Sequence, residues 1–207
     1  MGKHVQSGSA RRGDGCVPCA LWSSRPDLNA EVATHLLTLV LGGARSGKSR
    51  YAEGLIAAAP PPWIYIATAE ARDAEMAERI AQHRARRSNN WQTLEAPHDL
   101  AEALASAPKG PVLLDCLTLW LSNRMLADAD VDAEIDRLEA ALDRRAGTVV
   151  LVSNEVGFGI VPDNALARRF RDLQGRLNQR IAARVDRVVL VVAGLPLIVK
   201  GRPEERS

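Results

Sequence analysis

A glycine-rich segment between an apolar run and a helical run constrains this chain more than any other feature. Residues 37–41 (Leu-Thr-Leu-Val-Leu) favour a strand, and residues 42–49 (Gly-Gly-Ala-Arg-Ser-Gly-Lys-Ser) match the pattern G-x-x-x-x-G-K-[ST]. A helix is expected from Lys48 to about Ala58. Together these form a P-loop, in which backbone N–H groups and a helix N-terminus surround phosphate groups. The sequence therefore predicts a nucleoside triphosphate site.

The residue types in this loop have separate roles. Gly42, Gly43 and Gly47 lack a Cβ atom, so the backbone can approach the phosphates closely. Lys48 supplies a positive charge for the β- and γ-phosphates, and the hydroxyl of Ser49 is a ligand for Mg²⁺. Lys48 is therefore the expected catalytic cation, and Ser49 is an expected metal ligand.

A second apolar run ends in a carboxylate. Residues 111–116 read Pro-Val-Leu-Leu-Asp-Cys. In P-loop NTPases an acid at the end of a buried strand orients Mg²⁺ or its water. Alone, an apolar run ending in Asp is common, but beside a P-loop it indicates that Asp115 is the second metal ligand.

Alternating apolar runs and helical periods predict an α/β P-loop NTPase, with a mostly parallel sheet that helices cover on both faces. Further strands are expected at residues 63–68, 91–95, 148–153, 187–193 and 195–200. Further helices are expected at residues 73–87, 99–106, 131–145 (with Gly147 as C-cap) and 165–184, while 117–125 is helix or loop. Carboxyl ends of parallel strands share one edge, where ligands bind. We therefore expect residues 67–69 beside the phosphates, and Asn154-Glu155 either in a substrate loop or in a plain turn.

One histidine lies on a helical stripe with apolar residues. Met76, Ile80 and His83 fall at i, i+4 and i+7. A histidine on an apolar face is usually a core residue. However, Arg79, Arg84, Arg86 and Arg87 surround His83 in the sequence, which suits phosphates, and a neutral imidazole can attack phosphorus. A core role and a nucleophilic role both stay open for His83 on this pattern alone.

Composition limits the classes of partner. The chain has 27 basic and 25 acidic residues, which is too balanced to indicate a nucleic-acid or membrane surface by charge alone. The arginines of the expected helix 165–184 meet either a phosphate or water. No run approaches the roughly 20 apolar residues of a membrane span, and no signal-peptide core is present, so a cytoplasmic protein is expected. Residues 1–34 lack any period and are expected to be a disordered extension with Cys16 and Cys19 as free thiols, and residues 35–207 to form one domain.

Four segments together resemble the bifunctional adenosylcobinamide kinase / adenosylcobinamide-phosphate guanylyltransferase family of cobalamin biosynthesis. They are residues 42–53, 65–69, 75–84 (Glu-Met-Ala-Glu-Arg-Ile-Ala-Gln-His-Arg) and 153–162 (Ser-Asn-Glu-Val-Gly-Phe-Gly-Ile-Val-Pro). The resemblance covers residues 37–200 and implies a RecA-like fold, a homotrimer and a requirement for Mg²⁺. It implies that ATP or GTP phosphorylates the aminopropanol hydroxyl of adenosylcobinamide. GTP then gives GMP to that phosphate through a guanylylated histidine, which yields adenosylcobinamide-GDP and pyrophosphate.

The resemblance also implies site residues. The guanylylated histidine corresponds to His83. The nucleotide contacts correspond to Gly42, Gly43, Ala44, Arg45, Ser46, Gly47, Lys48, Ser49, Ala67, Thr68, Ala69, Arg84, Ala85, Arg86, Arg87, Glu95 and Asp115. The acid at the position of Asp115 can be a glutamate in relatives. The segment before residue 34 lies outside the resemblance, and a translational start placed too early would account for it.

Two other functions fit part of the pattern. A monofunctional small-molecule kinase would keep His83 in its core and release a nucleoside diphosphate instead of pyrophosphate. A RecA-like regulatory NTPase would bind a polymer through its arginine-bearing helix, and its hydrolysis would depend steeply on salt. The scattered tryptophans give the second alternative little support, because single-stranded nucleic acids need aromatic side chains beside basic ones.

Overall fold

The computed structural model describes residue 1 and residues 36–202, except residues 72 and 86. The expected N-terminal extension, with Cys16 and Cys19, lies outside the described residues. The elements are β1 (Leu36–Gly42), α1 (Lys48–Ala57), β2 (Trp63–Ala67), α2 (Ala74–Ala85), β3 (Trp91–Glu95), α3 (Leu100–Ser106), β4 (Val112–Asp115), α4 (Leu117–Leu126), α5 (Val131–Arg144), β5 (Thr148–Asn154), α6 (Ala165–Arg184), β6 (Arg187–Val192) and β7 (Leu195–Lys200). The expected strands and helices are confirmed, and their bounds agree with the expected ones within two residues.

Two details of the helices differ from the sequence prediction. For residues 117–125 the sequence left helix and loop both open. They are helical and belong to α4, which begins two residues after the end of β4. Gly147 is not the C-cap of α5, because the helix ends earlier and Arg145 occupies that position. Arg145 instead donates hydrogen bonds to the carbonyls of Ala107 (2.6 Å) and Gly110 (3.2 Å), and these contacts favour an earlier end of the helix.

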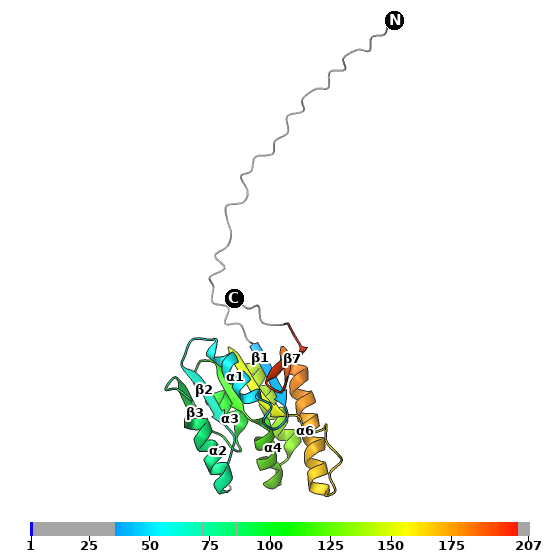
Figure 1. Cartoon of the computed structure of the whole chain (residues 1–207). Helices are drawn as coiled ribbons and strands as arrows, with labels where there is room; N and C mark the ends of the chain where they lie inside the picture. The colour runs from blue at the N-terminus through cyan, green and yellow to red at the C-terminus, as the bar shows by residue number, and fades with distance from the viewer. Residues whose placement is uncertain (2–35, 72, 86, 203–207) are drawn as a thin grey trace. The chain divides into compact units, whose positions relative to one another are not determined.

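The sheet has seven strands in the order β3-β2-β4-β5-β1-β6-β7. All neighbouring strands are parallel except β6 and β7, so the expected mostly parallel sheet is confirmed. Figure 1 shows α2 beside the β3 end of the sheet and α6 beside the β7 end. None of the described helices combines the length and the hydropathy that crossing a lipid bilayer requires.

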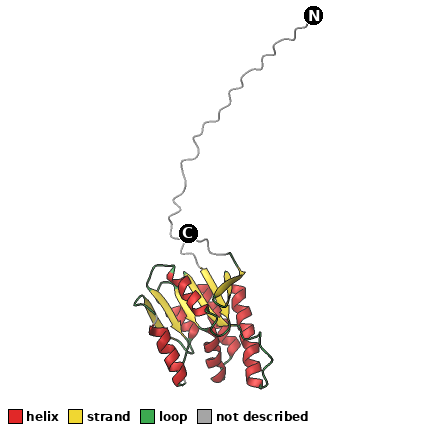
Figure 2. Cartoon of the chain, in the orientation of Figure 1, coloured by secondary structure: helices red, strands yellow, loops and turns green. Residues whose placement is uncertain are grey.

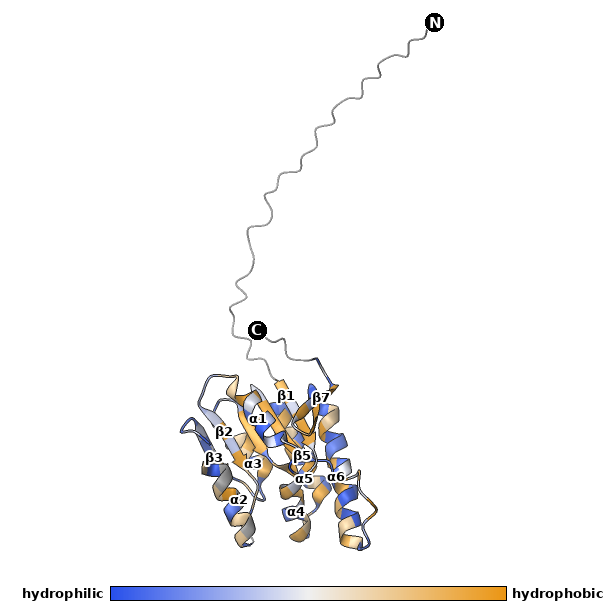
Figure 3. Cartoon of the chain, in the orientation of Figure 1, coloured by the Kyte–Doolittle hydropathy of each residue, from blue (hydrophilic) through white to orange (hydrophobic). Residues whose placement is uncertain are grey.

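Alternate residues of the central strands enter two different cores, one on each face. On β1, Leu37 and Leu39 pack in the larger core with side chains of α3, α4, α5 and α6, whereas Val40 packs on the other face against Ala52 and Ile56 of α1. Figure 2 shows the strands as a layer between helices, and Figure 3 shows that the central strands are mainly hydrophobic, in contrast to β3. Burial on both faces explains why the strands are apolar runs instead of alternating ones.

The strand register lines up the predicted site residues at one edge of the sheet. Glu95, Ala67 and Asp115 are direct neighbours on β3, β2 and β4, at the last residue of each strand. Gly42, the last residue of β1, pairs with Asn154, the last residue of β5. Since these are all carboxyl ends of parallel strands, the fold gathers them around the loop that follows β1.

A candidate nucleotide site

The loop between β1 and α1 has the close packing that its glycines predict. A Cβ atom on Gly42 would lie 2.5 Å from Ser46 Oγ and 2.7 Å from the carbonyl oxygen of Val191. Gly47 has a φ of 94°, which side chains disfavour, and it is the N-cap of α1. Ser46 accepts a hydrogen bond from the N–H of Gly194 in the β6–β7 turn (2.8 Å). The loop is therefore tied to β6 and to the turn after it.

A cavity of about 320 Å³ opens beside this loop. It is lined by Ala44, Arg45, Lys48, Ser49, Tyr65, Ala67, Ala69, Met76, Ile80, Arg84, Arg87, Glu95, Asp115, Cys116, Leu119 and Asn154. Most of the predicted site residues are thus brought together, from β1 to β5. A volume of this size falls in the usual range for small-molecule sites.

Several predicted residues do not line this cavity. Gly42 ends β1, and Gly43, Ser46 and Gly47 belong to the loop between β1 and α1. Ala85 and Glu155 are likewise not lining residues. Thr68 is fully buried. Its hydroxyl accepts a hydrogen bond from the N–H of Cys116 (2.8 Å) and donates one to the carbonyl oxygen of Cys116 (2.7 Å). The side chain of Thr68 therefore joins the ends of β2 and β4 and is not placed to contact a nucleotide.

Sequence reasoning missed Tyr65, which lies at the floor of the cavity. Its hydroxyl donates a hydrogen bond to Asp115 Oδ2 (3.1 Å), and the guanidinium carbon of Arg87 lies 3.4 Å from the centre of its ring. Burial, and next the charge of Asp115, raise the pKa of Tyr65 well above its usual range, so the phenol remains a donor. Tyr65 therefore contacts both Asp115 and Arg87 and positions them at the cavity. The sequence alone does not indicate these contacts, because they depend on the pairing of β2 with β4.

Cys116 is the thiol of the cavity. Burial, and next the charge of Asp115, raise its pKa to about 11. Because the thiolate is the reactive form, this cysteine is a poor nucleophile at neutral pH. Another group must carry any covalent step.

Helix α2, whose sequence contains the predicted nucleophile His83, contributes residues to the cavity lining. Ile80 and Arg84, three residues before and one residue after His83, both line it, as does Met76 on the same stripe. The backbone of His83 lies in α2, whereas its side chain and the whole of Arg86 lie outside the described residues. Arg84 forms an ion pair with Glu95, which joins α2 to the end of β3.

A buried polar network fixes the other side of the cavity. The N–H of Asn154 donates to Thr118 Oγ1 (2.7 Å), and its carbonyl accepts from Asn178 Nδ2 (3.0 Å). Ser153 Oγ donates to Asn178 Oδ1 (2.7 Å), and Gln174 Nε2 donates to both (2.9 Å each). These hydrogen bonds connect the end of β5 to α4 and α6 and thereby position Asn154 at the cavity.

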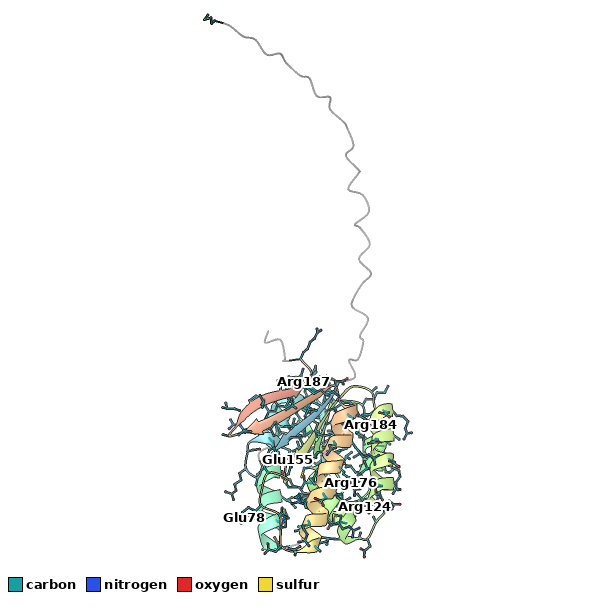
Figure 4. All side chains as sticks on the ribbon, turned by 90° about the vertical axis from the view of Figure 1, so that its right-hand side faces the viewer. Glu78, Arg124, Glu155, Arg176, Arg184 and Arg187 are labelled. Atoms are coloured by element: carbon teal, nitrogen blue, oxygen red, sulfur yellow. The ribbon has the colours of Figure 1, made fainter. Side chains whose placement is uncertain are left out.

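Arginines of α6 contact protein groups, which the sequence pattern did not anticipate. Arg180 and Arg184 form ion pairs with Glu139 of α5, at 2.8 Å and 3.0 Å. In Figure 4, Arg184 lies near one end of α6, on the side of α5. These two arginines therefore join α6 to α5 and do not face a phosphate.

The donor atoms suit Mg²⁺. Ser49 and Asp115 line the same cavity as Lys48, and a hydroxyl and a carboxylate are oxygen ligands that this ion uses. Among residues that the structure describes, no group of three or more His, Cys, Asp and Glu side chains gathers to hold a metal by itself. Mg²⁺ commonly takes one or two protein ligands together with substrate phosphates.

Comparisons with known proteins agree with this geometry. A family profile described as CobU, cobinamide kinase / cobinamide phosphate guanyltransferase, matches residues 38–199. The chain is 51% identical over 169 residues to the bifunctional adenosylcobalamin biosynthesis protein CobP of Pseudomonas aeruginosa, which covers 80% of this chain and 98% of the relative. It is 44% identical over 182 residues to the bifunctional adenosylcobalamin biosynthesis protein CobU of Salmonella typhimurium, covering 80% of this chain and 100% of that protein. A protein of the same name from Escherichia coli matches at 44% identity over 182 residues.

Proposed function

Because the chain belongs to the cobinamide kinase / cobinamide phosphate guanyltransferase family, we propose that the cavity beside Lys48 binds the nucleotide for both reactions. The family and the bifunctional relatives give the chain its two activities, the phosphorylation of cobinamide and the guanylyl transfer to cobinamide phosphate. The observation that carries the proposal is the meeting of Lys48, Ser49, Asp115 and Arg87 in one cavity.

The kinase reaction needs position and charge more than covalent chemistry. Lys48 and the N–H groups of the loop neutralise the phosphates of ATP or GTP. Ser49 and Asp115 would hold Mg²⁺, which supplies further charge to the γ-phosphate when bound. The oxygen of the aminopropanol hydroxyl attacks the γ-phosphorus, the bond to the β-phosphate oxygen breaks, and a nucleoside diphosphate leaves.

The guanylyl transfer uses two displacements on the α-phosphorus of GTP. A ring nitrogen of His83 forms a bond to that phosphorus, and pyrophosphate leaves. A phosphate oxygen of cobinamide phosphate then attacks the same atom, which frees the histidine and yields the GDP adduct. Support comes from the positions of Ile80 and Arg84, which flank His83 on α2 and line the cavity.

Labelling with α-³²P-GTP and Mg²⁺ tests the histidine. We expect the protein to carry label that is lost in acid and kept in base, and the His83→Ala variant to carry none. His98→Ala is the matched control, because His98 pairs with Glu70 (2.8 Å) and does not line the cavity. Equal labelling of the His83→Ala variant would refute the role of His83, whereas loss of label only in the His98→Ala variant would assign the nucleophile elsewhere.

Three further properties belong to this proposal. The enzyme requires Mg²⁺, acts in the cytoplasm and forms a homotrimer. For assembly, the edge strand β7 supplies an exposed apolar surface, at Leu195, Leu197 and Val199. A mass measurement in solution tests the trimer, and chelation by EDTA tests the metal.

The alternatives differ from the proposal in their products. A monofunctional kinase would release a nucleoside diphosphate and leave no nucleotide on the protein. A polymer-binding NTPase would need free arginines on α6, whereas Arg180 and Arg184 pair with Glu139 there. A product assay with cobinamide, GTP and Mg²⁺ separates these functions, because only the bifunctional enzyme forms both the phosphate and the GDP adduct.

A further inference from the structure

The cavity takes its lining from the part of the chain between Ala44 and Asn154. Its residues come from the loop itself, α1, β2, α2, β3, β4 and α4, and the last of them in the chain is Asn154 at the end of β5. The segment after Asn154 therefore begins at the cavity, and none of its residues lines it. Glu155, which Figure 4 labels, connects Asn154 to residues 156–162.

This segment, residues 156–162, is here called the apolar loop, and it exposes large hydrophobic side chains. Phe158 is 84% exposed, Ile160 is 98% exposed and Val161 is 61% exposed. Leu166, in the first turn of α6, is exposed as well. Single exposed hydrophobic residues are common, but several together beside a ligand site mark a binding surface.

Polar contacts at both ends hold the apolar loop in place. The N–H of Glu155 donates to the carbonyl of Gly42 (3.2 Å), the first residue of the P-loop, and Glu155 Oε1 accepts from the N–H of Gly157 (2.6 Å). Arg168 donates to the carbonyls of Pro162 (2.8 Å) and Asp163 (2.6 Å). The backbone is thus fixed by hydrogen bonds, while the hydrophobic side chains remain uncovered.

We propose that the apolar loop binds the corrin ring of cobinamide, so that the substrate hydroxyl reaches the γ-phosphate beside Lys48. This inference rests on the proposed function. A corrin ring is a large macrocycle with methyl and methylene groups on its edge, and it cannot share a cavity of about 320 Å³ with a nucleotide. The ring must therefore lie outside the cavity, on a surface that is continuous with it.

The apolar loop is that surface. Glu155 alone separates it from Asn154 of the cavity, and the N–H of Glu155 is bonded to the P-loop at Gly42. A second copy of the chain is a less suitable occupant, because stable protein interfaces use about 20–30 residues from each partner. Four exposed apolar side chains on and beside a short loop suit one macrocycle.

Binding and kinetics of the Phe158→Ser/Ile160→Ser double variant test this inference. Removing one apolar side chain that is buried in a complex weakens the affinity for the ligand about tenfold. We expect the Kd of cobinamide, measured by equilibrium dialysis, and the KM for cobinamide to rise about tenfold or more. The KM for the nucleotide and the labelling by α-³²P-GTP should stay as in the unaltered enzyme.

Leu126→Ser is the matched control. Leu126 is 55% exposed, and it is the last residue of α4 and neither lines the cavity nor belongs to β7. This variant should bind cobinamide as the unaltered enzyme does. An equal loss of affinity in the control would show that any exposed apolar residue has the same effect, and would overturn the inference.

Other outcomes also decide the question. An unchanged Kd for cobinamide in the double variant would overturn the inference, as would a loss of labelling by GTP. A lower mass of the double variant in light scattering would assign the apolar loop to contact with a second copy. Failure of the proposed function is a different result, because it would appear as absence of turnover in the unaltered enzyme even where cobinamide binds.

Discussion

The two adjacent glycines of the P-loop give a sharp test of the packing. In the Gly42→Ala variant, the new Cβ atom would lie 2.7 Å from the carbonyl oxygen of Val191. Ordinary contact begins at 3.4 Å, so β1 and β6 must separate by about 0.7 Å. The second close atom, Ser46 Oγ at 2.5 Å, belongs to a side chain that can rotate, whereas the carbonyl belongs to a paired strand.

Overpacking of this kind costs about 1–3 kcal/mol of unfolding free energy. For a domain of this length that corresponds to a fall in Tm of roughly 2–12 °C, at about 2–4 °C for each kcal/mol. The Gly43→Ala variant is the matched control, because a Cβ atom at Gly43 has no heavy atom within 4 Å. We expect that control to stay within about 0.5 kcal/mol of the unaltered protein.

Urea and thermal denaturation without nucleotide measure both variants. Nucleotide is left out, because the proposed site places the phosphates beside Gly43 and their binding would add to the measured stability. Equal stability of the Gly42→Ala variant and the unaltered protein would refute the reasoning. So would a larger loss in the Gly43→Ala variant, since the structure leaves that position open.

Three further variants test other contacts. Lys48→Ala should lower both activities by about 10²-fold or more, because one charge serves both reactions, and full guanylylation by this variant would contradict that. Glu139→Gln should lower stability at pH 7, because bonds from Arg180, and next those from Arg184, hold the pKa of Glu139 below its ordinary value of 4.5. That contribution is complete above pH 4.5 and disappears as the pH falls through the lowered pKa, so urea curves of the variant and the unaltered protein should converge in acid. Tyr65→Phe should cost about 1–2 kcal/mol of unfolding free energy, as it removes the hydrogen bond to Asp115, and a variant of unchanged stability would show that this bond contributes nothing.

Features that depend on neighbouring residues were predictable from the sequence. Apolar runs predicted the strands, and the glycine pattern predicted the loop at residues 42–49. Both kinds of structure depend on the backbone conformation of consecutive residues, which the local sequence determines. The gathering of Ala67, Asp115 and Asn154 followed from one rule about parallel strands.

Features that depend on pairing across the sheet were not predictable. The sequence does not indicate that Thr68 turns inward to Cys116, or that Tyr65 lies between Asp115 and Arg87. The residues next to a tyrosine in a strand, or next to an arginine on a helix, do not indicate which distant residue it will contact. Arg180 shows the same limit, because its position on α6 suits water or phosphate equally until α5 packs beside it.

The geometry also bears on how one nucleotide site can serve two reactions. The kinase acts on the γ-phosphorus of a triphosphate and the guanylyl transfer acts on the α-phosphorus, so the two acceptors must approach different ends of the phosphate chain. The cavity provides two separate flanks for them, α2 with its cavity-lining Ile80 and Arg84 on one side, and the end of β5 with Asn154 on the other. If His83 serves the first flank and the apolar loop serves the second, changes on one flank should leave the reaction of the other intact. A variant of the apolar loop that loses cobinamide binding but is still labelled by GTP would therefore show that the two flanks act separately, because a single shared flank would lose both properties together.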